Sequence, residues 1–85
     1  MSVKGDESMT LYVSEMYDGD TMEKILLGVF SKQAYAEQAG SNFFDEQELT
    51  GIELLDWDYE NNIITYYYSH NYTLTITEIE LDKRY

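Results

Sequence analysis

The C-terminal part of the chain holds three segments in which apolar or aromatic residues alternate with polar ones: residues 52–59, 63–69 and 72–82. This period of two is typical of half-buried β-strands. The segments are separated by Glu60-Asn61-Asn62 and by His70-Asn71, which are turn sequences because asparagine tolerates the left-handed backbone region. The pattern therefore predicts a three-stranded antiparallel meander.

The last of these segments changes its alternation midway. Leu74 and Ile76 occupy even positions, whereas Ile79 and Leu81 occupy odd ones. A β-bulge near residues 77–78 would produce this change, and so would a strand that leaves one partner for another. The residues leave both explanations open.

A hairpin is expected nearer the N-terminus. Residues 10–17 and 24–30 are rich in β-branched, aliphatic and aromatic side chains. Between them, Asp18-Gly19-Asp20 predicts a turn, because glycine adopts positive φ and an aspartate side chain can bond its own backbone. Residues 1–9 show no periodicity, and we expect them to form a mobile N-terminal arm.

One helix is expected after this hairpin. Ser31 is the predicted N-cap, since its hydroxyl can accept a hydrogen bond from a free amide of the first turn. The helix ends either at Gly40 or at Phe44, and both ends fit the pattern. The order β-β-α-β-β-β predicts an α+β fold, a small antiparallel sheet with one helix packed on one face. Four side chains share one face of this helix: Ala34, Tyr35, Gln38 and Ala39.

Length and composition limit the class of protein. At 85 residues we expect one domain, formed by residues 10–85. With 44% hydrophobic residues the chain is too apolar for a disordered acidic tail. The lack of cysteine excludes disulfides, thiolate metal sites and thiol nucleophiles. No apolar run is long enough for a membrane span or a signal peptide, so we expect a cytoplasmic protein.

The charge is strongly one-sided. Seventeen Asp and Glu against five Lys and Arg give a formal net charge of −12, whereas small soluble domains usually carry a magnitude of about 2–8. Residues 33–82 contain eleven acids and neither Lys nor Arg. Such a field repels phosphate backbones and anionic membranes, and it attracts basic protein surfaces. The alternative is that the acids serve solubility only.

Two rows of carboxylates repeat every second residue, one row in each of two predicted strands. Residues on the same face of a strand are about 6.6–7 Å apart, which is comparable to the phosphate spacing along one nucleic-acid strand. Tryptophan and tyrosine side chains near the first row can supply apolar contacts, since these residues dominate interface hot spots. The predicted partner-binding residues are Asp56, Asp58, Glu60, Glu78, Glu80, Asp82, Trp57, Tyr59 and Tyr67.

No group of residues indicates a reaction. His70 is the only histidine and lies in a predicted turn without a positioned partner. The acidic row that starts at Asp56 begins like a calcium loop, but Asn61 and Tyr67 stand where that loop requires glycine and glutamate. The five glycines are isolated, so no phosphate-binding loop is expected. We expect no catalytic residues, no cofactor and no dedicated metal site.

Several short motifs occur together in this chain. They are a strand with Tyr12 and Tyr17, the Asp18-Gly19-Asp20 turn, the Leu27-Gly28-Val29-Phe30-Ser31 entry into a helix with Ala34, Ala36 and Ala39, and the closing Glu78-Ile79-Glu80-Leu81-Asp82-Lys83 strand. In these motifs the chain resembles a family of small uncharacterised bacterial and phage α+β domains. The resemblance covers most of residues 10–44 and 73–84. It implies a β-β-α-β architecture and transfers no catalytic residue.

Charge, small size and the phage members of this family lead to one functional hypothesis. The chain is expected to be a phage-encoded, non-enzymatic acidic protein of the host cytoplasm. It would dock on a basic, nucleic-acid-binding host or defence protein and inhibit it by nucleic-acid mimicry, without binding nucleic acid itself. The alternative is a small structural or interaction module, dimeric through its tyrosine-rich face, with acidity that serves solubility only.

Overall fold

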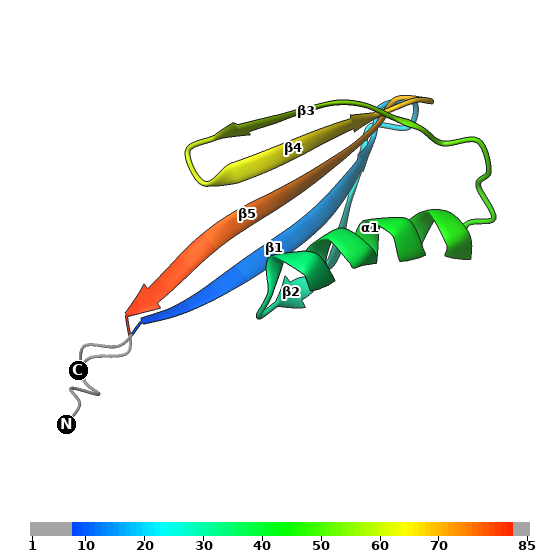
Figure 1. Cartoon of the computed structure of the whole chain (residues 1–85). Helices are drawn as coiled ribbons and strands as arrows, with labels where there is room; N and C mark the ends of the chain where they lie inside the picture. The colour runs from blue at the N-terminus through cyan, green and yellow to red at the C-terminus, as the bar shows by residue number, and fades with distance from the viewer. Residues whose placement is uncertain (1–7, 83–85) are drawn as a thin grey trace.

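Residues 8–82 are the part of the chain that the computed structural model describes (Figure 1). They form an α+β fold with one helix and five antiparallel strands, as the sequence predicts. The elements are β1 (Ser8–Asp18), β2 (Glu23–Phe30), α1 (Gln33–Glu46), β3 (Leu54–Glu60), β4 (Ile63–Tyr68) and β5 (Tyr72–Asp82).

The strands lie in the order β2-β1-β5-β4-β3, so the last strand of the chain is at the centre of the sheet. β5 pairs with β1 in one unbroken register from Asp82 to Tyr72, but it pairs with β4 only from Thr73 to Thr77. Beyond Glu78, where β2 has also ended, β1 and β5 continue as a two-stranded ribbon past α1 (Figure 1). The alternation changes at that point because β5 leaves β4.

Of the two explanations left open, the bulge near residues 77–78 is wrong, because the register against β1 has no shift there, and the change of partner is confirmed. The structure instead has register shifts at two other places. One lies between Ser14 and Glu15, where β1 pairs with β2, and the other lies between Leu54 and Asp56, where β3 pairs with β4.

The three predicted turns are present, although in the first the residue with positive φ is Met22, at 63°, and not Gly19. The Asp20 N–H donates to Oδ1 of Asp18 at 2.9 Å, which closes the first turn. Asn61 and Asn62 have φ of 54° and 66°, and the two residues of the His70-Asn71 turn each have φ of 64°. Two consecutive left-handed residues give a tight hairpin whose twist matches that of the flanking strands. This fixes which residues of β3 and β4 face one another.

The helix begins one residue later than expected. Its N-cap is Lys32 with extended backbone and no side-chain cap, so the prediction of Ser31 is wrong. The Lys32 carbonyl accepts the first N–H groups, from Tyr35 and Ala36. The helix continues through Gly40 and ends at Glu46, so the end at Gly40 is wrong and the helix runs two residues past the other expected end, Phe44.

The core lies between α1 and the strands β1, β2 and β5. Buried Ser14 donates a hydrogen bond to the Ala36 carbonyl at 3.0 Å, which ties β1 to the helix. Gly40 allows close approach, since a Cβ there would lie 2.7 Å from Cδ2 of Leu74. The buried apolar residues are Met16, Ala36, Phe44, Leu74 and Ile76.

Two predicted boundaries need correction. β1 begins at Ser8, so residues 8 and 9 belong to a strand and not to the expected arm; residues 1–7 lie outside the described residues. β3 begins at Leu54, two residues after the predicted start, because residue 52 lies in the connection from α1. In the described part of the chain, no helix has the length and apolar character needed to cross a bilayer.

Candidate functional site: an exposed edge strand beside an apolar groove

β3 is an edge strand, and all seven of its residues are exposed. Its pairing with β4 places Trp57 opposite Tyr66 and Tyr59 opposite Ile64. These four side chains share the face of the sheet that carries α1, since Tyr66 and Ile64 lie beside the buried residues of β5. Trp57 remains 61% exposed and Tyr59 54% exposed. Large aromatic side chains on β3 thus remain accessible to solvent.

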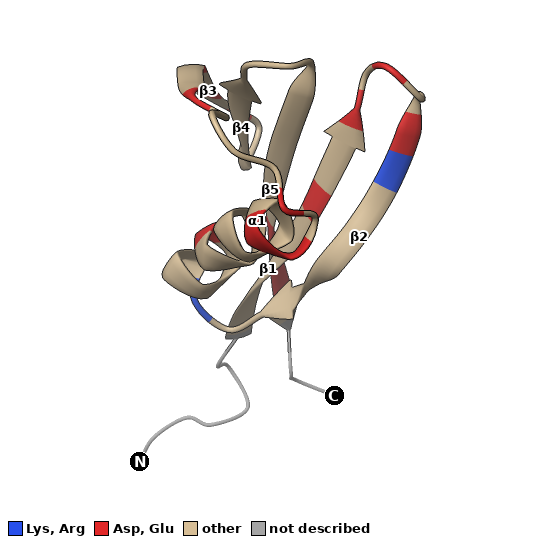
Figure 2. Cartoon of the chain, turned by 90° about the vertical axis from the view of Figure 1, so that its right-hand side faces the viewer, with Lys and Arg blue, Asp and Glu red and all other residues tan. Residues whose placement is uncertain are grey.

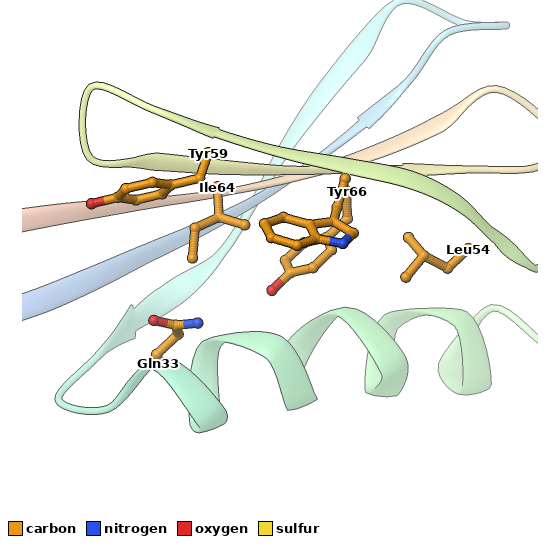
Figure 3. Close-up of a pocket in the computed structure, with 6 residues that line it drawn as sticks. Gln33, Leu54, Tyr59, Ile64 and Tyr66 are labelled. Carbon is orange, nitrogen blue, oxygen red and sulfur yellow. The ribbon is translucent and has the colours of Figure 1, made fainter.

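A groove separates the β3–β4 hairpin from α1, and its volume is about 330 Å³. Figure 3 shows Ile64 and Tyr66 pointing from the hairpin toward the helix, Tyr59 lying along the hairpin, and Gln33, in the first turn of α1, pointing back toward the hairpin. We call this space the hairpin groove. It is lined by Gln33, Leu54, Trp57, Tyr59, Ile64 and Tyr66.

The groove stays open because of the composition of the helix. The buried side of α1 carries Ala36, Gly40 and Phe44, with four-residue spacing, and packs on the sheet centre. The side toward the hairpin carries Gln33, Glu37 and Ser41, again with four-residue spacing. These polar side chains leave the aromatic side chains of the hairpin uncovered. A second hollow of about 240 Å³ shares two lining residues with the hairpin groove; it is lined by Glu37, Ser41, Leu54, Tyr66, Tyr68 and Leu74.

One hydrogen bond crosses from the helix to the hairpin. The Tyr66 hydroxyl donates to Oε2 of Glu37 at 2.6 Å, and the Gln33 amide donates to the same oxygen at 3.1 Å. Burial, followed by the hydrogen bond and negative charge of Glu37, raises the pKa of Tyr66. Burial and the charge of Glu37 also raise the pKa of Tyr68. Both hydroxyls therefore keep their protons to a higher pH than an ordinary tyrosine does.

The first predicted acidic row lies on the opposite face of β3. In the β3–β4 pairing, Asp56 lies opposite Tyr67, Asp58 opposite Thr65 and Glu60 opposite Ile63. Because side chains alternate between the two faces of a strand, these three carboxylates point away from the groove. The hairpin contains these three carboxylates and neither Lys nor Arg. Within residues 8–82, Lys residues occur only in β2 and just before α1, far along the chain from the hairpin (Figure 2).

The second predicted acidic row lies on the other face of the sheet. Asp58 pairs with Thr65, which pairs with Thr75, so the face of Asp58 is that of the odd residues of β5. Glu78 and Glu80 are even and share the face of the groove. The end of the row, at residue 82, lies at the limit of the described residues. One flat partner surface cannot contact both rows, so the nine predicted residues do not form a single site.

Within the hairpin, the predicted residues are divided between the two faces. Tyr67 lies opposite Asp56, on the acidic face, whereas Trp57 and Tyr59 line the groove. Sequence reasoning did not select Ile64 and Tyr66. The tight Asn61-Asn62 turn carries the signal that would have found them, because it fixes their pairing with Tyr59 and Trp57.

His70 lies in a turn, as predicted, and its Nδ1 is 3.0 Å from Oγ of Ser69. It borders a more polar hollow with Asp20, Glu48 and Tyr72. Burial and then the charges of the Asp18–Asp20 turn raise the pKa of Tyr72. Among residues 8–82, no three His, Cys, Asp or Glu side chains are grouped so that they could hold a metal ion.

No family model, curated protein or solved structure matches the chain, so its resemblance to small bacterial and phage domains stays a prediction.

Proposed function

We propose that the chain is a non-enzymatic binding protein that docks on a basic protein through the β3–β4 hairpin. The observation that carries this proposal is the exposure of β3 together with its two chemically different faces. One face presents Asp56, Asp58 and Glu60, and the other presents Trp57 and Tyr59. Carboxylates attract a basic surface, and exposed aromatic residues supply the apolar contacts that hold it.

The proposed partner binds nucleic acid. The three carboxylates of β3 repeat at the strand spacing of about 6.6–7 Å, which is close to the spacing of phosphates in one nucleic-acid strand. A basic groove that tracks phosphates can therefore accept this row in their place. The mimicry is limited to one row, because Glu78 and Glu80 face the other side of the sheet. By occupying the partner's basic groove, the chain would compete with nucleic acid and so inhibit the partner.

The experiment that tests this function compares two variants of equal charge. In the first variant, three residues of β3 are changed to Lys: Asp56, Asp58 and Glu60. In the second variant, three exposed acids elsewhere are changed to Lys: Asp45, Glu46 and Glu48. Each tagged protein is used in a pull-down from nuclease-treated bacterial lysate, washed with rising salt. The proposal expects one basic nucleic-acid-binding protein to be retained by the wild type and by the second variant, and to be lost by the first.

The purified partner is then tested for nucleic-acid binding in a mobility-shift assay with and without the chain. Competition predicts that the wild-type chain releases the nucleic acid and that the β3 variant does not. Equal loss of the partner from both variants would show that net charge alone acts. Retention by both variants would show that the β3 carboxylates do not bind the partner, and unchanged nucleic-acid binding would show that the chain does not inhibit.

The second candidate function is a self-associating module. Its supporting observation is the same uncovered β3 edge, because an exposed edge strand can pair with another copy. Two copies of β3 would place acidic rows beside one another, and like charges on neighbouring strands are destabilising. Light scattering on the wild-type chain decides this point: a stable dimer would favour the module over the inhibitor.

A further inference from the structure

Between residues 56 and 60, the outer edge of β3 presents the backbone groups of two residues. In an antiparallel pair, residues alternate between those bonded to the neighbouring strand and those that point away. The two-residue turn starts the ladder at Glu60 and Ile63, so the groups of Asp58 and Asp56 also point toward β4. Those of Trp57 and Tyr59 point away from the sheet. In agreement, the Trp57 N–H donates to Oδ1 of Asp56 at 2.8 Å.

We infer that the partner binds as an extended segment that adds to β3 as a sixth, antiparallel strand. This inference rests on the proposed function and names the partner's recognised element. All existing pairs of the sheet are antiparallel, so the added strand continues its geometry. Strand addition obtains affinity from backbone hydrogen bonds and specificity from alternate side chains.

The two faces of β3 determine which segment fits. Side chains of the added strand that lie opposite Asp56 and Asp58 share the acidic face, where Lys or Arg is favoured. Side chains that lie opposite Trp57 and Tyr59 share the face of the hairpin groove, where aliphatic side chains bury apolar surface. The occupant is therefore an extended segment of the basic partner in which basic and apolar residues alternate.

Binding requires one local change at the edge. The Trp57 N–H must leave the Asp56 carboxylate, which then becomes available to a cation of the incoming strand. The exchange replaces one hydrogen bond to the backbone with another and adds a charged pair. One donor of the edge is thus capped when β3 is free, and a strand that brings positive charge compensates for the release of that cap.

The test uses Trp57, the only tryptophan, as a fluorescent reporter inside the site. The probe is a synthetic peptide of alternating Lys and Val with the length of β3, 7 residues. Its control has the same composition with Lys and Val in separate blocks. We expect the alternating peptide to shift Trp57 emission to shorter wavelength and to bind about tenfold more tightly than the block peptide.

Backbone methylation of the peptide tests the pairing directly. Residues opposite Trp57 and Tyr59 direct their N–H groups at β3, and these are the Val residues. N-methylation of the Val residues is expected to weaken binding about tenfold or more, whereas N-methylation of the Lys residues leaves it nearly unchanged. Strand addition would be overturned by any of three results. The two methylated peptides bind equally, the block peptide binds as tightly as the alternating peptide, or no peptide binds.

The two proposals fail separately. If strand addition is overturned while the partner is still lost by the β3 lysine variant, the hairpin binds a basic surface by side chains alone and the proposed function stands. If that variant retains the partner as well, both proposals are wrong.

Discussion

The hydroxyl of Tyr66 donates a hydrogen bond to Glu37 across 2.6 Å, and these residues lie 29 positions apart in the chain. This bond joins β4 to α1, the two elements between which the hairpin groove lies. It ties the hairpin to the helix while the aromatic side chains of β3 remain uncovered.

Tyr66→Phe is expected to lower the free energy of unfolding by about 1 kcal/mol. Hydrogen bonds to charged groups contribute roughly 1.5–3 kcal/mol, and the partly exposed position of this one reduces its value. Urea denaturation measures the change. Tyr59→Phe is the control, because its hydroxyl makes only an exposed 3.4 Å contact with Asn62. Equal stability of the two variants would mean that the Tyr66 bond does not hold the hairpin.

The stability of the fold is expected to fall as the pH rises above 10.0, the ordinary pKa of tyrosine. The pKa values of Tyr66, Tyr68 and Tyr72 are raised in the fold, so above this pH the unfolded chain loses their protons first. Below pH 10.0 these tyrosines are protonated in both states and add no pH dependence. The charged groups that face them are Glu37, Asp18 and Asp20.

Urea midpoints on either side of pH 10.0 measure this effect. Tyr68→Phe should make the decline shallower, because it removes one of the groups whose ionisation favours the unfolded chain. A decline of the same steepness in wild type and variant would contradict the assignment.

The fold was largely predictable because its signals are local. Alternation found the strands, and Asn61-Asn62 and His70-Asn71 gave the turns, since positive φ depends on residue type. The parity change in β5 predicted an irregularity near Thr77. It could not distinguish a bulge from a change of partner, because the pairing of β5 with β1 on one side and with β4 on the other depends on residues far apart in the chain.

The candidate site was less predictable for the same reason. Asp56, Asp58 and Trp57 were selected from one strand, where alternation alone assigns their faces. The grouping with Glu78 failed because the relative faces of two strands depend on register through β4. The helix wall at Gln33 was missed because only tertiary packing brings it to the hairpin.

Gly40→Ala is expected to destabilise the fold by about 1–3 kcal/mol, although alanine favours helices more than glycine does. A Cβ at this position would lie 2.7 Å from Cδ2 of Leu74, so either the helix or the buried Leu74 side chain must shift. Thermal unfolding measures the loss. Ser41→Ala, at the next and exposed position, is the control and should change stability by only a few tenths of a kcal/mol. A more stable Gly40→Ala variant would show that Leu74 can yield.

Trp57→Ala is expected to change the free energy of unfolding by less than about 1 kcal/mol, because the indole is 61% exposed. Leu74→Ala, at a position 1% exposed, should lower it by about 2–5 kcal/mol. Chemical denaturation followed by circular dichroism compares them. A large loss at Trp57 would mean that this side chain stabilises the fold and is not held for a partner.

Neutralising the acidic row of β3 is expected to cause self-association. Changing Asp56, Asp58 and Glu60 to Thr leaves a good strand former at each position and removes the charges that keep two copies of the edge apart. It also frees the Trp57 N–H from its cap on Asp56, which adds a donor to the outer edge. Changing Asp45, Glu46 and Glu48 to Thr removes as much charge elsewhere, so it separates the edge effect from lost solubility. Light scattering over a concentration series should show growth in mass for the β3 variant only. Association of both variants, or of neither, would mean that the carboxylates of β3 do not guard the edge, and the exposed strand would need another explanation for remaining unpaired.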